Sequence, residues 1–381
     1  MNFKRIILLI LFFAVLCTSL FPQNIYAIVL FSLSTYLLLP LRKWWDRTCV
    51  ALLMFSVFYV IMVVLGGRLN SGFLAVSYLV TPVAFYRFGH YLMLQYQSEK
   101  ERFRLLLFIG WAYLINIFFL ILADIAIVGI VNTDRTLVGT SSEDDTLVAT
   151  IYGLMASVGI GCIGACFAKG TKVMKLVFLL LVGLSMLTVI HLINRGGIVI
   201  LVFCLLSSVF LYYRKRRVQL MLVMLFLFII GFYVLNSGIL GDDILNAYEQ
   251  RSNVKGHGTM TAGGRTELWS MSIKNMLINP LGWTQEAYAH NLWLDLAKIG
   301  GWIALAPFLA ATFFSIKNLI KVGLKSRMDF SKAIAVLGSA LILAASIEPV
   351  IEASMLFFAL LMLIWGITDA IWRQELRSRL R

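Results

Sequence analysis

Three side chains at polar breaks in an otherwise apolar chain have the types and spacing to bind a phosphate-rich ligand. Arg195 is followed by Gly196 and Gly197, and Arg265 precedes a pattern typical of a short helix. Arginine can bind phosphate through two parallel hydrogen bonds. The free backbone N–H groups at the start of a helix can bind the same anion. His290 lies just before an apolar run, and histidine can exchange a proton near neutral pH. Together they predict an anion site beside a proton donor or acceptor.

Each residue also has a simpler explanation. Arg195 could cap a tight turn at the membrane surface, Arg265 could pair with Glu267 or another acid of the loop, and His290 could be an amphipathic anchor. An arginine that faces lipid is unfavourable in free energy, however, so Arg195 is expected to point into the bundle or into a water-filled cavity. Two arginines on one side of a membrane favour a diphosphate over a single carboxylate.

Three further residues are candidates for supporting roles. His191 lies one turn before Arg195, and Glu348 and Glu352 lie in the turn between the last two apolar runs. Acidic residues at such depth usually have partners, so Arg195 or Arg265 is a plausible partner for them. The alternative is a solvated turn.

The composition indicates what must position these groups. The chain has 381 residues, of which 60% are hydrophobic and only 14% charged, unlike a soluble protein of this length. The net charge of +14 would suit nucleic acid if the basic residues formed one stripe, but they lie in short clusters between apolar runs. Such clusters are typical of topology signals, so no nucleic-acid partner is expected.

Twelve apolar runs approach the length of about 20 residues that a membrane span needs. The expected spans are 5–22, 25–41, 48–66, 72–90, 103–131, 146–168, 173–194, 196–213, 217–235, 290–316, 332–347 and 350–372. With a cytoplasmic N-terminus, 24 of the 33 Lys and Arg residues fall in the inner loops, as the positive-inside rule requires. The first run has the outline of a signal peptide but no small-residue cleavage site, so it is expected to stay as a span. The prediction is an all-α polytopic membrane protein with about 12 transmembrane helices and both termini cytoplasmic.

This topology predicts one membrane domain over residues 1–381 with a large outer loop at 236–289. Within the loop, apolar residues recur every three or four positions after Arg265. Thr266 is a candidate cap and Asn279-Pro280 a stop signal, which predicts a short amphipathic helix on the membrane interface. Nucleotide sugars and ATP are not available on that outer face.

No metal or cofactor is expected. No pair among the histidines, which include His90 and His257, has a spacing and setting typical of zinc, and no segment matches a calcium loop or a phosphate-binding glycine loop with lysine. The five cysteines lie in or at the ends of apolar runs and imply neither a disulfide framework nor a thiolate site.

The motifs together resemble the O-antigen ligase and O-antigen polymerase superfamily. The similar segments are Arg195-Gly-Gly, Gly264-Arg265 with Trp269, Asn279-Pro280-Leu-Gly282, and His290-Asn291 with Gly300-Gly301. The resemblance implies a membrane glycosyltransferase C-type architecture in the bacterial cytoplasmic (inner) membrane, with the active site on the periplasmic face. It also implies inverting transfer of a glycan from an undecaprenyl-diphosphate carrier to a hydroxyl group, without a metal ion.

The resemblance assigns roles and partners. Arg195 and Arg265 would bind the diphosphate, and His290 would lie near the donor phosphate or the acceptor hydroxyl. The expected partners are an undecaprenyl-diphosphate-linked glycan donor, a glycan or lipid-linked acceptor and membrane lipids, with a chain-length regulator as an optional further partner.

The type of acceptor stays open between two members of this class. A ligase must receive lipid A-core, which is rich in phosphate, and the large loop has five acids against four bases. Because such a surface suits an anionic acceptor poorly, a repeat-unit polymerase is favoured over a ligase. A lipid-linked glycan transporter is the alternative outside the enzymes, but it would need charges along a pathway, and Asp124 is the nearest such residue.

Overall fold

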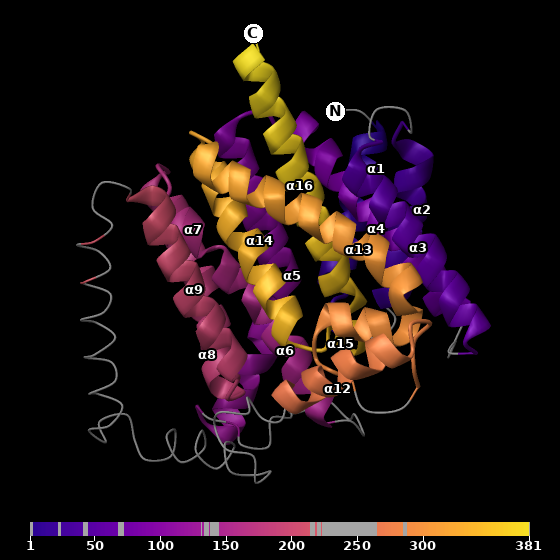
Figure 1. Ribbon diagram of the computed structural model, residues 1–381. Helices are drawn as coiled ribbons and strands as arrows, with labels where there is room; N and C mark the ends of the chain where they lie inside the picture. Colours follow the sequence, from indigo (N-terminus) through magenta and orange to yellow (C-terminus); the bar gives the residue numbers. More distant parts are fainter. Residues whose placement is uncertain are drawn as a thin grey trace.

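The computed structural model describes residues 3–21, 24–40, 45–67, 72–130, 145–213, 265–284 and 288–380, with the single residues 132, 137, 218 and 222. Every regular element in this part of the chain is a helix (Figure 1). The helices are α1 (Phe3–Cys17), α2 (Asn24–Leu38), α3 (Arg47–Leu65), α4 (Gly72–Gln95), α5 (Glu99–Val128), α6 (Asp145–Gly161), α7 (Ile163–Cys166), α8 (Lys172–His191), α9 (Arg195–Tyr212), α12 (Arg265–Ile278), α13 (Leu292–Lys325), α14 (Asp329–Ile347), α15 (Val350–Ala353) and α16 (Met355–Leu380).

Among the described residues, eight helical segments are long and apolar enough to cross a membrane. They lie in α3, α5, α6 with α7, α8, α9, α13, α14 and α16, and α2 is a shorter apolar helix. The predicted all-helical class is therefore confirmed. The predicted ninth span, 217–235, falls outside the described residues apart from 218 and 222, so the count of twelve and the sidedness stay predictions.

Polar residues between the apolar runs determine where several helices begin. In each case a side-chain oxygen accepts a hydrogen bond from a backbone N–H of the first turn, which would otherwise have no partner. The capping residues are Asp46 for α3, Ser98 for α5, Thr171 for α8, Asn194 for α9 and Asn291 for α13. Two of these caps, Asn194 and Asn291, directly adjoin the predicted functional residues.

The centre of the bundle is built around α16. This helix packs against α4, α13 and α14, and α13 packs against α3. A Cβ atom added at Gly366 of α16 would overlap the backbone of Tyr86, and one added at Gly89 of α4 would overlap the backbone of Leu363. Glycine at both positions lets the two helix backbones approach closely, as small residues do between membrane helices.

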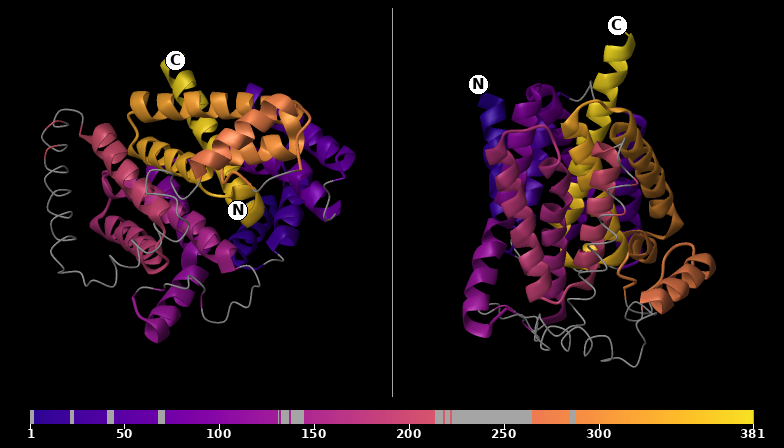
Figure 2. Two further views of the ribbon diagram at one scale, coloured as in Figure 1. Left: turned by 60° about the horizontal axis from the view of Figure 1, so that its bottom comes forward. Right: turned by 90° about the vertical axis from the view of Figure 1, so that its left-hand side faces the viewer.

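One end of the bundle gathers the segments that contain the predicted site. The end of α8, the start of α9, α12, the start of α13, the end of α14 and α15 all lie there, and we call it the α12 end (Figures 1 and 2). The start of α1 and the end of α16 lie at the opposite end (Figure 1). Residues far apart in sequence are thereby placed in one region.

The bounds of α12 agree with the prediction at the end of the helix and differ from it at the start. The helix begins at Arg265, so Thr266 lies inside it and is not its N-cap. It ends at Ile278, directly before Asn279-Pro280, as predicted. Leu277 and Ile278 are exposed, which is a feature expected of an interfacial helix.

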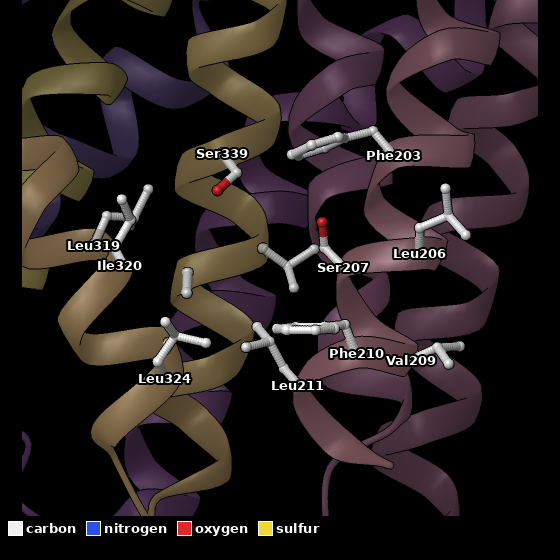
Figure 3. Close-up of a pocket in the computed structure, with 13 residues that line it drawn as sticks. Phe203, Leu206, Ser207, Val209, Phe210, Leu211, Leu319, Ile320, Leu324 and Ser339 are labelled. Carbon is white, nitrogen blue, oxygen red and sulfur yellow. The ribbon is translucent and has the colours of Figure 1, made fainter. Parts of the chain in front are cut away.

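An apolar cavity of about 450 Å³ lies between α9, α13 and α14 (Figure 3). Phe203 and Phe210 of α9 line it together with Leu319 and Leu324 of α13. These residues lie in the halves of α9 and α13 that are distant from Arg195 and His290. The cavity is therefore separate from the predicted site.

Candidate functional site

Arg195 is presented by a tight turn between α8 and α9. Ile193 in this turn has φ of 50°, a left-handed conformation that β-branched residues rarely adopt. The N–H of Asn194 donates to Val189 O (2.8 Å), and its side-chain oxygen accepts from the N–H of Gly197 (3.1 Å). Arg195 is consequently the first residue of α9 and is half-buried at the α12 end.

A buried polar cluster supports this turn. His191 Nε2 lies 2.7 Å from Asp124 Oδ2, and His191 Nδ1 lies 3.0 Å from the carbonyl oxygen of Ile130. Asn132 donates its side-chain amide to Asp124 (2.7 Å) and its backbone N–H to His191 O (2.9 Å). Because the carbonyl oxygen of Ile130 can only accept, His191 donates to it from Nδ1. His191 and Asp124 are both buried, so the predicted supporting residue holds the turn from beneath.

Arg265 and Glu348 form an ion pair that joins α12 to the end of α14. Arg265 Nη2 lies 3.3 Å from Glu348 Oε2, and the Glu348 side chain is 7% exposed against 27% for Arg265. The other carboxylate oxygen faces the start of α9, since a Cβ added at Gly196 would lie 3.0 Å from Glu348 Oε1. Glu348 therefore lies between the helix starts that present Arg195 and Arg265.

Glu352, the second predicted acid, lies in α15, and its side chain falls outside the described part of the structure.

His290 lies in a second left-handed turn, with φ of 53°. Trp269 of α12 donates its indole N–H to the carbonyl oxygen of Ala289 (2.8 Å). Asn291, the N-cap of α13, donates its side-chain amide to Ser346 O (3.0 Å), two residues before Glu348. The turn that contains His290 is thus attached to the same two helices, α12 and α14, that form the ion pair.

The glycine and proline motifs meet at a kink in α13. Gly301 has φ of 60° and interrupts the helix, and the N–H of Trp302 donates to Pro280 O (2.8 Å). A Cβ at Gly301 would lie only 2.5 Å from that carbonyl oxygen. Glycine is needed here for both the backbone conformation and the close approach. The kink lets the segment after α12 pack onto α13, which orients α12 and its first residue, Arg265.

Arg265, the Glu348 carboxylate and the His290 turn lie at this end of the bundle with Arg195, and the buried carboxylate of Asp295 lies there as well. Arg195 and Arg265 are the first residues of α9 and α12, where the positive ends of the helix dipoles favour an anion. These features are those expected of a site for a phosphate-rich ligand.

A different polar cluster lies around the ends of α4 and α16. Ligand atoms of Asp46, His90 and Asp369 lie within 4.8 Å of one another, a grouping that could in principle hold a metal ion. Arg373, however, lies 2.6 Å from a carboxylate oxygen of Asp46 and 2.6 Å from one of Asp369. The guanidinium contacts both carboxylates, and His90 Nε2 lies 3.2 Å from Asp369 Oδ2, so the three residues belong to an ion-pair network with Arg373.

Asp295 is a buried polar residue of the α12 end outside the predicted set. It lies in the first turn of α13, in a mostly apolar span. An acidic residue in such a setting usually has partners, and this signal could have identified it from the sequence.

The described part of the chain is a helical membrane protein with the candidate site at one end of its bundle. Residues 176–309 match the family model described as O-antigen ligase. The match runs from α8 into α13 and includes Arg195, Arg265 and His290. It confirms the resemblance to the O-antigen ligase and polymerase superfamily and supports a function of that general type in a multi-pass membrane protein. The chain matches no curated protein.

Proposed function

We propose that the protein transfers a glycan from an undecaprenyl-diphosphate carrier to a sugar hydroxyl at the outer face of the bacterial cytoplasmic membrane. The observation that carries this proposal is the position of Glu348 between the helix starts of Arg195 and Arg265. The two arginines come from separate segments whose helix starts flank one carboxylate, and such a pair would suit the two phosphates of the carrier. The family match over the same segment supports the proposal.

In the proposed reaction, the acceptor oxygen attacks the anomeric carbon from the face opposite the diphosphate. A new carbon–oxygen bond forms while the bond to the diphosphate oxygen breaks, and the electron pair leaves with the diphosphate. Arg195 and Arg265 stabilise the negative charge that grows on this leaving group, so they bind the transition state more tightly than the ground state. No metal ion is assigned a role.

His290 takes one of two roles in this scheme. It either accepts the proton that the acceptor hydroxyl releases or holds a phosphate oxygen of the donor, in which case the departing diphosphate takes that proton. Glu348 orients the Arg265 side chain through the ion pair and so holds the guanidinium in position to bind the phosphate.

We further propose that the acceptor is a second carrier-linked glycan, which makes the enzyme a repeat-unit polymerase. The support is the excess of acids over bases in the predicted loop 236–289, although residues 236–264 lie outside the described structure. The second candidate is a ligase that transfers the glycan to lipid A-core. The description of the matched family model favours that candidate.

The test is turnover by the purified protein in lipid vesicles, with a carrier-linked oligosaccharide and chelator present. Elongated carrier-linked glycan identifies a polymerase, and glycan attached to added lipid A-core identifies a ligase. We expect Arg195→Ala, Arg265→Ala and His290→Ala each to lower turnover by about 100-fold or more, the scale of losing one transition-state donor.

The matched control is Lys274→Ala, which removes an exposed basic residue from the same helix as Arg265 and should leave turnover unchanged. Movement of the carrier-linked glycan across the membrane with no new glycosidic bond would instead identify a transporter. Full turnover in all three variants would exclude the assigned site.

A further inference from the structure

The backbone of His290 is held in a conformation that needs support. Among the described residues, only Ile193 and His290 have positive φ without being glycine. Such a conformation costs on the order of 1–3 kcal/mol and persists only where the surrounding structure fixes it. The contacts around His290 therefore determine where its imidazole points.

The carboxylate of Asp295 spans this turn. Its Oδ1 accepts from the N–H of Ala289 (2.7 Å), and its Oδ2 accepts from the N–H of Asn291 (3.0 Å). One carboxylate thus holds the backbone N–H on each side of His290. Hydrogen bonds to an ionised acceptor are about twice as strong as those between neutral groups.

Asp295 is in a position to orient His290 but not to meet a substrate. It is 1% exposed, and it is attached to α13 one turn after the N-cap Asn291. Trp269 and Ser346 hold the same turn through the carbonyl of Ala289 and the side chain of Asn291. The turn is therefore fixed to α12, α13 and α14 together, and Asp295 accepts hydrogen bonds from the N–H groups on both sides of His290.

We propose that Asp295 is the positioning residue that holds the left-handed turn of His290 and so sets the place of its imidazole in the reaction. This inference rests on the proposed glycosyl transfer. It assigns to Asp295 no contact with substrate and no proton transfer. Its loss should therefore impair His290 while the arginines still bind the donor.

The first test compares Asp295→Asn with the parent protein in the vesicle assay. The amide keeps the size of the side chain but replaces one of the two accepting oxygens by an NH2 group, which only donates, so one of the two hydrogen bonds is lost. We expect kcat to fall by about 100-fold, the effect of a misplacement of roughly 1 Å, while KM for the carrier-linked donor changes by no more than about twofold. The matched control is Asp329→Asn at the start of α14, where a carboxylate also accepts from a backbone N–H, that of Lys169 (2.8 Å).

The second test is a double-variant comparison. If Asp295 acts through His290, adding Asp295→Asn to His290→Ala should lower the residual kcat by no more than about twofold. A loss that multiplies in the double variant would show a general structural effect and overturn the proposal. Unchanged kcat in the single variant would overturn it as well.

A third measurement does not depend on turnover. Diethylpyrocarbonate modifies accessible imidazole rings, and peptide mass spectrometry locates the modified histidine. We expect the rate at His290 to change at least threefold in Asp295→Asn and to stay at the parent value in Asp329→Asn. An unchanged rate would refute the positioning role. Absence of turnover in the parent protein would count against the proposed function, and the modification rate would then decide the role of Asp295 alone.

Discussion

At the scale of the residue, the shape of a charged group matters as much as its sign. Arg265 meets Glu348 through one guanidinium nitrogen, Nη2, at 3.3 Å. The planar guanidinium has further N–H donors, which can bind a phosphate while the contact with Glu348 is kept. A lysine ammonium is a single point charge and cannot hold a carboxylate and a phosphate in the same fixed geometry.

Arg265→Lys should therefore behave almost like a loss of the side chain. We expect kcat/KM in the vesicle assay to fall by about 10- to 100-fold, in line with a loss of about 1.5–3 kcal/mol for a hydrogen bond to a charged group. Lys274→Arg, on the exposed side of the same helix, is the control and should keep the parent value. Parent-like turnover in Arg265→Lys would mean that charge alone suffices at this position.

At the scale of the element, helix contacts decide how rigid the frame of the site is. In the apolar stretch of α16, 89% of the residues are buried, whereas in that of α9 only 28% are buried. The frame is therefore held mainly by α16 and its neighbours, while α9 contributes its first turn to the site. The close contact between α4 and α16 at Gly366 is the point where added volume is least tolerated.

Gly366→Ala should destabilise the fold by about 1–3 kcal/mol, because the added methyl group overlaps the backbone of Tyr86. Thermal unfolding in detergent would report this as a lowered Tm. Gly183→Ala in α8 is the matched control, since no atom lies within 4 Å of the added Cβ. In a helix interior the control should be stabilising by about 0.5–1 kcal/mol. Equal Tm values for both variants would contradict the close packing of α4 and α16.

At the scale of the whole molecule, the proposed function requires that the α12 end face outward. The α12 end contains the predicted site, and the opposite end contains the start of α1 and the end of α16 (Figure 1). The clusters of basic residues predict that this opposite end is cytoplasmic.

Cysteines placed at the two ends would test that orientation. In intact spheroplasts, a membrane-impermeant maleimide should label Lys274→Cys of α12 directly, and it should label Arg327→Cys, between α13 and α14, only after permeabilisation. Both positions are exposed, and the parent protein gives the background from its five native cysteines. The reverse pattern would place the arginines in the cytoplasm and remove the basis for a lipid-linked donor.

The sequence by itself determined the helical class and most of the helix positions. Apolar runs predict spans because a helix satisfies its own backbone hydrogen bonds in lipid, and this depends only on nearby residues. Motif spacing likewise identified Arg195, Arg265 and His290 as candidates, and Asn279-Pro280 marked the end of α12. Each of these inferences depends on short stretches of chain.

Only the tertiary structure decided which candidates meet. The partner that Arg265 contacts is Glu348, 83 residues away, and neighbouring Glu267 is not the residue that forms this pair. His191 became a buried support of the Arg195 turn through Asp124, 67 residues away. The left-handed backbone conformations of Ile193 and His290 could not be predicted, because neither residue type indicates such a conformation. At His290 the conformation is held by contacts with a later part of the chain, such as those of Asp295. Local chemistry sets where helices begin and end, but contacts between distant segments set which side chains form the site.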